Sequence, residues 1–216
     1  MLIACWSVKG GSGTTVVATA LALLHARAGG ALVADLVGDV PAALGLPDPA
    51  GPGLAAWLAA ADDVGADALE RLAVSVAPGL DLLATGPPDP AAGRPGRGAA
   101  LAAALATRDR AVVVDAGSSP TGAALDIAAA AAVSLLVVRP CFLALRRAVA
   151  APVRPSGVVL VREPGRSLGR RDVEDALSVP VCAEVDLEPA VARAVDAGLL
   201  AARLPRSLAH ALRHAA

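Results

Sequence analysis

Short runs of apolar, largely β-branched residues alternate with longer Ala- and Leu-rich stretches along most of this chain, and this alternation limits the possible folds more than any other feature. Runs that are apolar at nearly every position are typical of strands covered on both faces. Their alternation with helical patterns predicts repeated β–α units, and therefore an α/β fold with a doubly wound, mostly parallel sheet and helices on both faces. The expected strands are Leu2–Ser7, Ala31–Asp35, Leu80–Ala84, Ala111–Asp115, Val133–Val138, Gly157–Val161 and Val179–Val185.

The β-branched runs disfavour the alternative of a helical bundle. Two segments rich in Pro and Gly, Pro47–Gly53 and Gly86–Gly98, are expected to be loops. Neither is long enough to separate two domains, so we expect a single domain over residues 1–216. The expected helices are Thr14–Ala28, Leu54–Ala61, Gly98–Thr107, Thr121–Ala131, Leu143–Ala150, Arg170–Leu177 and Glu188–Ala197.

The composition excludes several classes of protein. A hydrophobic content of 56% excludes a disordered chain. A formal net charge of −1 gives the whole chain no attraction for nucleic acid or membranes. The charge is nevertheless uneven, because the residues up to Val138 hold 7 basic and 12 acidic side chains, whereas those from Arg139 onward hold 12 basic and 8 acidic ones.

Cysteine usage and hydropathy indicate where the protein resides. Its 3 cysteines are widely spaced within apolar runs, which predicts buried thiols in a reducing compartment rather than disulfides or a metal site. Met1–Val8 has no basic region before it and does not resemble a signal peptide. The longest apolar run, Ile127–Val138, is too short to cross a bilayer. We therefore expect a cytoplasmic protein without an integral membrane segment.

A glycine loop, VKGGSGTT at residues 8–15, connects the first expected strand to the first expected helix. In this context the backbone N–H groups of glycines converge on a phosphate, and the helix N-terminus adds partial positive charge. A plain tight turn also requires glycine, so the glycines alone leave both interpretations open. Lys9 favours phosphate binding, because it is the only lysine among 19 basic residues and its ammonium is a compact charge.

The loop resembles the deviant Walker A motif of the ParA/MinD family of P-loop ATPases, which reads roughly KGGxGK[ST]. Lys9 matches the family's signature lysine, which reaches the partner subunit's phosphates in a nucleotide-sandwich dimer, and it is therefore also a catalytic candidate. Thr15 matches the hydroxyl that holds Mg²⁺, whereas Thr14 stands in place of the Walker lysine that binds phosphate. The resemblance implies ATP or ADP with Mg²⁺ as ligands, held by Lys9, Gly10, Gly11, Ser12, Gly13, Thr14 and Thr15.

The segments that resemble the family's switch regions supply the acidic candidates. Asp35 matches the first acidic position of switch I and is the second catalytic candidate, whereas Val37 replaces the acid linked to hydrolysis. Asp115, in the segment resembling Walker B, would bind Mg²⁺, and Gly117 would approach the γ-phosphate. A structural alternative stays open for both aspartates, because Asp35 and Asp115 could each cap a following helix. Asp39 could be a displaced substitute for the missing acid, but we expect it to cap the helix that begins near Pro41.

Two further segments resemble the family's base-binding elements. Arg162 matches the arginine of an Asn-Arg pair at the end of a strand and is included among the nucleotide-binding candidates. Val161, however, stands where the family has the asparagine that reads adenine. Residues 181–200 resemble the late segment whose backbone packs on the base.

The departures at Thr14 and Val37 predict slow or absent hydrolysis, because each lost group costs a few kcal/mol of transition-state stabilisation, or roughly a hundredfold in rate. The resemblance then implies a nucleotide-responsive switch or scaffold that forms a homodimer and docks to a protein partner.

Within the family, three features are most similar to the CpaE/TadZ branch. They are the LVGD step at residues 36–39, the strand that ends in prolines at residues 80–88, and the paired threonines of the glycine loop. This similarity implies a partner in pilus or secretion-system assembly or in subcellular positioning. The protein would then lie in the cytoplasm, at the inner face of the membrane or at a cell pole.

Three other functions stay open. A ParA-like partitioning protein would bind non-specific DNA through the arginines beyond Val138, although no basic run accompanies them. A nucleotide-free pseudo-ATPase would keep only the scaffold, and a small-molecule kinase or ligase is disfavoured by Thr14. Leu204, Leu208 and Leu212 form one helical stripe, which we expect to pack on the domain rather than to bind a membrane.

Overall fold

Eight strands form one mostly parallel sheet in the computed structural model, which describes residues 1–61 and 64–215. The strand order is β3-β4-β2-β5-β1-β6-β7-β8, and of the described strands only β3 runs antiparallel to its neighbour. The expected doubly wound α/β fold is therefore confirmed. The strands are β1 (Leu2–Ser7), β2 (Ala31–Asp35), β3 (Val74–Ala77), β4 (Leu80–Leu83), β5 (Ala111–Ser118), β6 (Val133–Val138), β7 (Gly157–Arg162) and β8 (Val181–Asp186).

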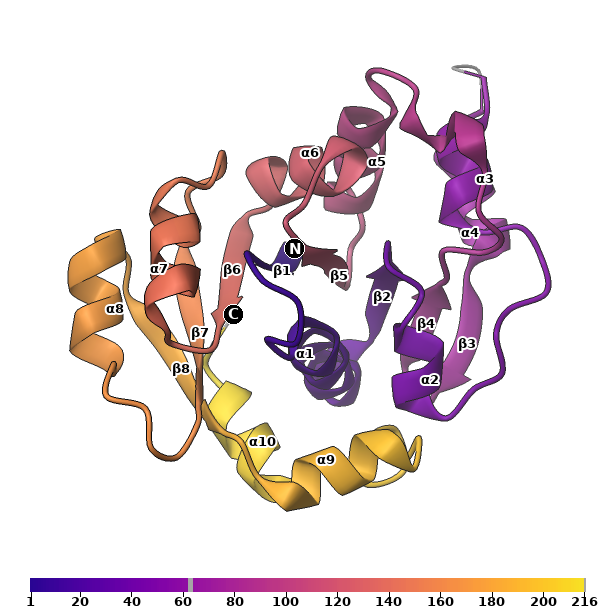
Figure 1. The fold of residues 1–216 in the computed structure, drawn as a ribbon. Coiled ribbons are helices and arrows are strands. Elements are labelled where there is room, and N and C mark those ends of the chain that lie inside the picture. The colour runs from indigo at the N-terminus through magenta and orange to yellow at the C-terminus, as the bar shows by residue number, and fades with distance from the viewer. Residues whose placement is uncertain (62–63, 216) are drawn as a thin grey trace.

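Helices cover both faces of this sheet (Figure 1). One face carries α1 (Thr14–Gly29), α2 (Val40–Leu44), α9 (Pro189–Asp196) and α10 (Arg206–Leu212). The opposite face carries α3 (Leu54–Ala59), α4 (Asp67–Leu72), the short 3₁₀ helix η1 (Pro90–Gly93), α5 (Arg97–Ala106), α6 (Gly122–Ala130), α7 (Phe142–Val149) and α8 (Arg170–Leu177).

The central strand β1 shows how the apolar runs produce two cores. Side chains of a strand alternate between the faces of its sheet, so Leu2 and Trp6 pack in one apolar layer and Ile3 and Cys5 pack in the other. Every residue of β1 is buried. An apolar side chain is therefore favourable at nearly every position, as the sequence predicts.

The structure differs from the expectation between residues 64 and 98. The sequence pattern does not predict the strand β3 or the helix α4, and the segment Gly86–Gly98 contains η1 and the start of α5 instead of being a loop throughout. The strand β3 lies at the sheet edge, where Val74 is 60% exposed, so burial imposes no continuous apolar run on it.

The C-terminal stripe packs as expected. Leu204, Leu208 and Leu212 are all buried against the face that carries α1. Within residues 1–61 and 64–215, helices of the length and apolarity needed to cross a membrane do not occur.

Candidate functional site

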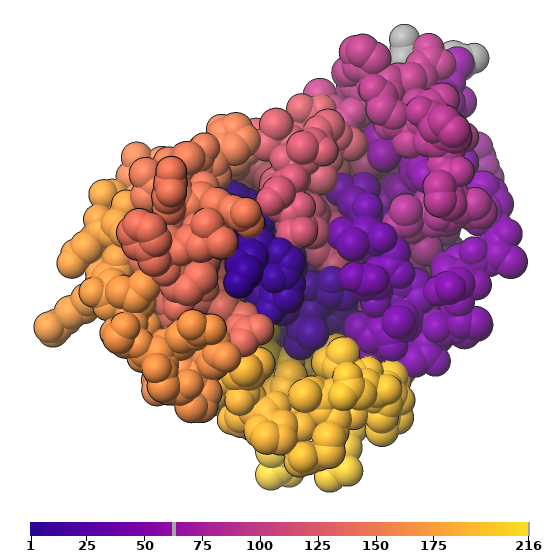
Figure 2. Space-filling view, in the orientation of Figure 1, coloured from indigo at the N-terminus to yellow at the C-terminus, as the bar shows by residue number. Residues whose placement is uncertain are grey.

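The glycine loop lies at the carboxyl end of β1, in the middle of the sheet. The strand β1 pairs with β5 on one side and β6 on the other, so the chain winds away from it in both directions. Crevices at such a reversal of strand order are where open α/β sheets bind ligands. Figure 2 shows the indigo N-terminal part of the chain at the centre of one face, with orange, violet and yellow segments around it.

The loop backbone is shaped as an open cradle. Gly11 and Gly13 have φ angles of 74° and 89°, a region that favours glycine. Apart from the adjacent residues in the chain, no atom of residues 1–61 or 64–215 lies within 4 Å of the positions that a Cβ would take at Gly10, Gly11 or Gly13. The 16-residue helix α1 begins immediately after Gly13, so its first N–H groups and its dipole face this space. The geometry fits the binding of a phosphate group.

Lys9 is exposed at the tip of the loop. Its carbonyl accepts hydrogen bonds from the Ser12 hydroxyl at 2.8 Å and the Ser7 hydroxyl at 3.1 Å. These bonds hold the turn while the side chain stays at the surface. Thr14, by contrast, is buried with 8% exposure and is the first residue of α1, one position after the N-cap residue Gly13.

A second cation reaches this loop from another strand. Arg139 directly follows β6, and its Nη1 donates to the Gly11 carbonyl at 3.2 Å while its Nη2 pairs with Glu163 at 2.9 Å. Together with Lys9 and Arg166, Arg139 lines a cavity of about 80 Å³ beside the loop. Sequence reasoning missed Arg139, although an arginine at the carboxyl end of a strand was the available signal.

Asp115 lies beside the loop on β5, paired in register with Cys5 of β1. Burial raises the pKa of Asp115 to about 6, although the nearby Thr15 hydroxyl and the Gly117 amide lower it. Its Oδ1 accepts from the Gly117 amide at 3.1 Å, but its buried Oδ2 has no hydrogen-bond partner in the described part of the chain. An orphaned carboxylate oxygen beside a hydroxyl fits the oxygen ligands of Mg²⁺.

Asp35, the register partner of Asp115 on β2, is held by backbone amides. Its carboxylate accepts from the amides of Val37, Gly38 and Val40 at 2.9, 2.7 and 3.1 Å. These bonds fix the turn into α2. The expectation that the Asp39 side chain caps this helix is wrong, because that side chain makes no cap hydrogen bond and Asp35 satisfies the amides instead.

Val37 and Gly117 are in close contact across the site. Gly117 has a φ of 69°, and a Cβ there would lie 2.6 Å from Val37 Cγ2. The position compared with a hydrolysis-linked acid therefore presents an apolar side chain, which has no polar atom to orient water.

An apolar pocket of about 160 Å³ opens on the other side of Gly13. Val161 forms part of its wall, so the position compared with an adenine-reading asparagine offers no side-chain hydrogen bond here. Arg162 does not line this pocket and pairs with Asp186 at 3.2 Å at the surface. The late segment resembling a base-binding element does reach it, through Val185, Leu187 and other residues of 185–196.

Comparisons with solved structures identify the fold. MinD of Pyrococcus horikoshii, solved with Mg-ADP, is 18% identical, with a TM-score of 0.78 over 97% of this chain and 91% of that one. A ParA family ATPase from Chlorobium tepidum is 19% identical, with a TM-score of 0.81 over 98% and 95%. McdA of Cyanothece in an ATP complex is 18% identical, with a TM-score of 0.70 over 98% and 94%. No protein-family model and no curated protein matches the sequence.

These likenesses show that the chain has the P-loop NTPase fold of MinD and ParA proteins. In the class of protein that this fold defines, the phosphate-binding glycine loop follows a strand and opens a helix, as the loop after β1 does here.

Proposed function

We propose that this chain is a single-domain, ParA/MinD-like nucleotide-binding switch that binds ATP or ADP with Mg²⁺ at the glycine loop. The observation that carries the proposal is the open loop at Gly10–Gly13, together with an Asp115 Oδ2 that has no partner in the described part of the chain and an apolar pocket that Gly13 borders. Phosphates, a divalent cation and a base would each find groups of matching chemistry there. The cation would neutralise phosphate charge.

Different residues would bind the phosphates, the metal and the base. Gly10, Gly11, Ser12, Gly13 and Thr14 would supply backbone N–H groups to the phosphates, and Thr15 and Asp115 would hold the metal. Gly117, whose amide donates to Asp115, would approach the terminal phosphate. Arg162, as a partner of Asp186, would contribute at the rim of the base pocket.

Charge at the phosphates comes from Lys9 and from Arg139 rather than from a lysine at position 14. The Arg139 guanidinium already contacts the loop backbone at Gly11. Its Nη2 pairs with Glu163, so it would bind phosphate by exchanging that carboxylate for a phosphate oxygen. Hydrolysis is nevertheless slow or absent, since the Asp35 carboxylate is engaged by three amides and Val37 cannot orient water.

Dimerisation and docking would use the surface next to the loop. Lys9 is exposed, and Phe142, Leu143 and Val149 of α7 are 76%, 44% and 64% exposed. Arg147 of the same helix donates to the Val8 carbonyl at 3.5 Å, so α7 borders the loop. A second copy or a protein partner on this surface would cover apolar side chains and bring the exposed ammonium to the phosphates across the interface.

The proposed partner belongs to pilus or secretion-system assembly or to subcellular positioning. The basis for this partner is the similarity of the sequence to the CpaE/TadZ branch. The protein would then act in the cytoplasm, at the inner face of the membrane or at a cell pole. Non-specific DNA is the second candidate partner, favoured by the 12 arginines beyond Val138.

The test is a titration with ATP and with ADP in the presence of Mg²⁺, following binding by calorimetry and dimerisation by sedimentation, with Lys9→Ala as the comparison. We expect wild type to bind both nucleotides, and Lys9→Ala to lose ATP-linked dimerisation while its melting temperature without nucleotide is unchanged. A single-turnover assay should give hydrolysis far slower than the binding steps. Absence of binding would contradict the proposal and leave a nucleotide-free scaffold.

A further inference from the structure

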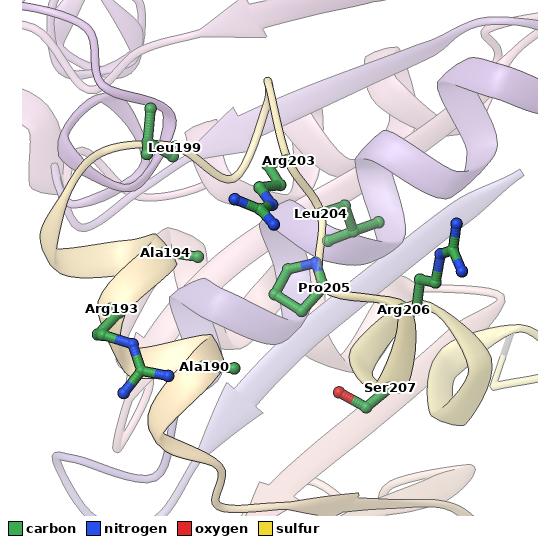
Figure 3. Close-up of a pocket in the computed structure, with 9 residues that line it drawn as sticks. All are labelled: Ala190, Arg193, Ala194, Leu199, Arg203, Leu204, Pro205, Arg206 and Ser207. Carbon is green, nitrogen blue, oxygen red and sulfur yellow. The ribbon is translucent and has the colours of Figure 1, made fainter.

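A groove lined by arginines lies between α9 and the segment that leads into α10 (Figure 3). Its volume is about 750 Å³, within the range of sites that bind ligands. Arg193 comes from α9, and Arg203 and Arg206 come from the opposite side. In Figure 3 the Arg206 guanidinium points away from the other two, so Arg193 and Arg203 are the central cations.

The cations of the groove are not neutralised. Arg193, Arg203 and Arg206 form no ion pair within residues 1–61 and 64–215, whereas Arg162 and Arg170 elsewhere in the C-terminal half both pair with Glu184. Positive charge at this groove is therefore available to a ligand.

Small and apolar side chains line the groove beside the cations. They are Ala190, Ala194, Leu199, Leu204 and Pro205, and Leu199 is 45% exposed. The groove therefore combines positive charge that is unpaired among the described residues with a partly apolar lining.

This chemistry distinguishes between anionic partners. A DNA duplex presents phosphates on a convex surface and needs no apolar lining. A membrane needs protruding apolar groups rather than a hollow. An acidic segment with interspersed apolar side chains satisfies both the guanidinium groups and the apolar lining, since carboxylates pair bidentately with arginine.

We propose that this groove binds an acidic, leucine-bearing segment of a partner protein, and that its occupancy is coupled to the nucleotide site. The coupling rests on the proposed function and on α9, which is shared by two sites: Ala190 and Arg193 line the groove, whereas Val191 and Val195 line the apolar pocket beside Gly13.

Two observations connect the groove to that pocket. The helix α9 packs on the core only through half-buried side chains, Val191, Ala194 and Val195, so fewer buried contacts hold it than hold α1. The Ser207 hydroxyl of the groove also donates to Glu188 of the pocket at 2.9 Å. A ligand in either place can therefore shift the same helix.

The first test uses the full chain without nucleotide and a fluorescent peptide of alternating Glu and Leu. Its matched control is the same peptide with Gln for Glu. We expect binding of the acidic peptide only, weakened about tenfold by Arg193→Gln and by Arg203→Gln, because each loses one charged hydrogen-bonding partner. Arg171→Gln, which changes an exposed arginine on α8, should leave the affinity unchanged.

Three results would overturn the groove assignment: equal binding of the Gln peptide, equal losses in Arg171→Gln, or a DNA duplex that binds more tightly than the peptide and is equally sensitive to Arg193→Gln. The second test repeats the titration with Mg-ADP. A changed peptide affinity supports the coupling, and an unchanged affinity in protein that binds Mg-ADP overturns it. Failure to bind Mg-ADP at all contradicts the proposed function instead, while the nucleotide-free titration still decides the groove.

Discussion

Asp35 and Asp115 are register partners on the neighbouring strands β2 and β5, yet both carboxylate oxygens of Asp35 accept hydrogen bonds, whereas only Oδ1 of Asp115 does so among the described residues. Asp35 accepts hydrogen bonds from three backbone amides, whereas Asp115 Oδ2 is buried without a hydrogen-bond partner in the described part of the chain. Asp35 is also among the charges that raise the pKa of Asp115. One aspartate thus organises a turn and the other is available to a cation.

The first prediction concerns Asp115 and pH. Burial raises its pKa to about 6 from 3.8, so the folded state binds the proton more tightly than the unfolded state does. Its contribution to stability is complete below the unfolded pKa and is lost as pH rises through 6, a change of about 3 kcal/mol. Asp115→Asn avoids this loss, so without nucleotide it should unfold at higher urea than wild type at neutral pH, with the difference vanishing near pH ~4.

The same variant should lose the stabilisation by Mg²⁺ that wild type gains with ADP. Melting curves with ADP, with and without Mg²⁺, measure this effect. An Asn variant that is less stable than wild type at neutral pH would contradict an unpartnered Oδ2, and retained Mg²⁺ dependence would contradict its role as a metal ligand.

The second prediction concerns Asp35. Asp35→Ala removes the acceptor of three amides and should destabilise the fold by roughly 3 kcal/mol or more, measured by urea unfolding. Asp39→Ala is the matched control, since the exposed Asp39 side chain makes no cap hydrogen bond, and it should change stability by less than about 0.5 kcal/mol. If Asp35→Ala and Asp39→Ala lose similar amounts of stability, the hydrogen bonds to the Asp35 carboxylate do not stabilise the turn as proposed.

The sequence predicts the sheet well because burial on both faces forces continuous apolar runs in its central strands. The apolar pattern does not predict β3. This strand lies at the sheet edge, where Val74 is 60% exposed, so its residues need not all be apolar. The resemblance to the family's motifs, rather than the apolar pattern, also selects Lys9, Thr15 and Asp115, which the structure places around the carboxyl end of β1. The place of Arg139 after a predicted strand could have marked it as a candidate, but its contact with Gly11 was not predictable, because the two residues are 128 positions apart and meet only through the pairing of β1 with β6.

The third prediction concerns Gly117 and Val37. Gly117→Ala places a side chain at a φ of 69° and 2.6 Å from Val37 Cγ2, so it should cost about 2 kcal/mol of stability. In a Val37→Ala background only the backbone strain remains, and the cost should fall to about 1 kcal/mol. The double-mutant cycle measures this difference by urea unfolding. Equal costs in both backgrounds would mean that Val37 moves aside freely.

The last prediction concerns Arg139 as the cation that compensates for Thr14. Removing a guanidinium that contacts the loop should weaken Mg-ADP binding about tenfold in Arg139→Ala, whereas Arg171→Ala should have no effect. Thr14→Lys in the Arg139→Ala background should restore most of the affinity, because it returns a positive charge to the start of α1. Calorimetric titration measures each of these proteins beside wild type. The prediction is contradicted if Arg139→Ala binds Mg-ADP as wild type does while Lys9→Ala binds it more weakly. Lys9 would then supply the positive charge to the phosphates, and Arg139 would only hold the Gly11 carbonyl.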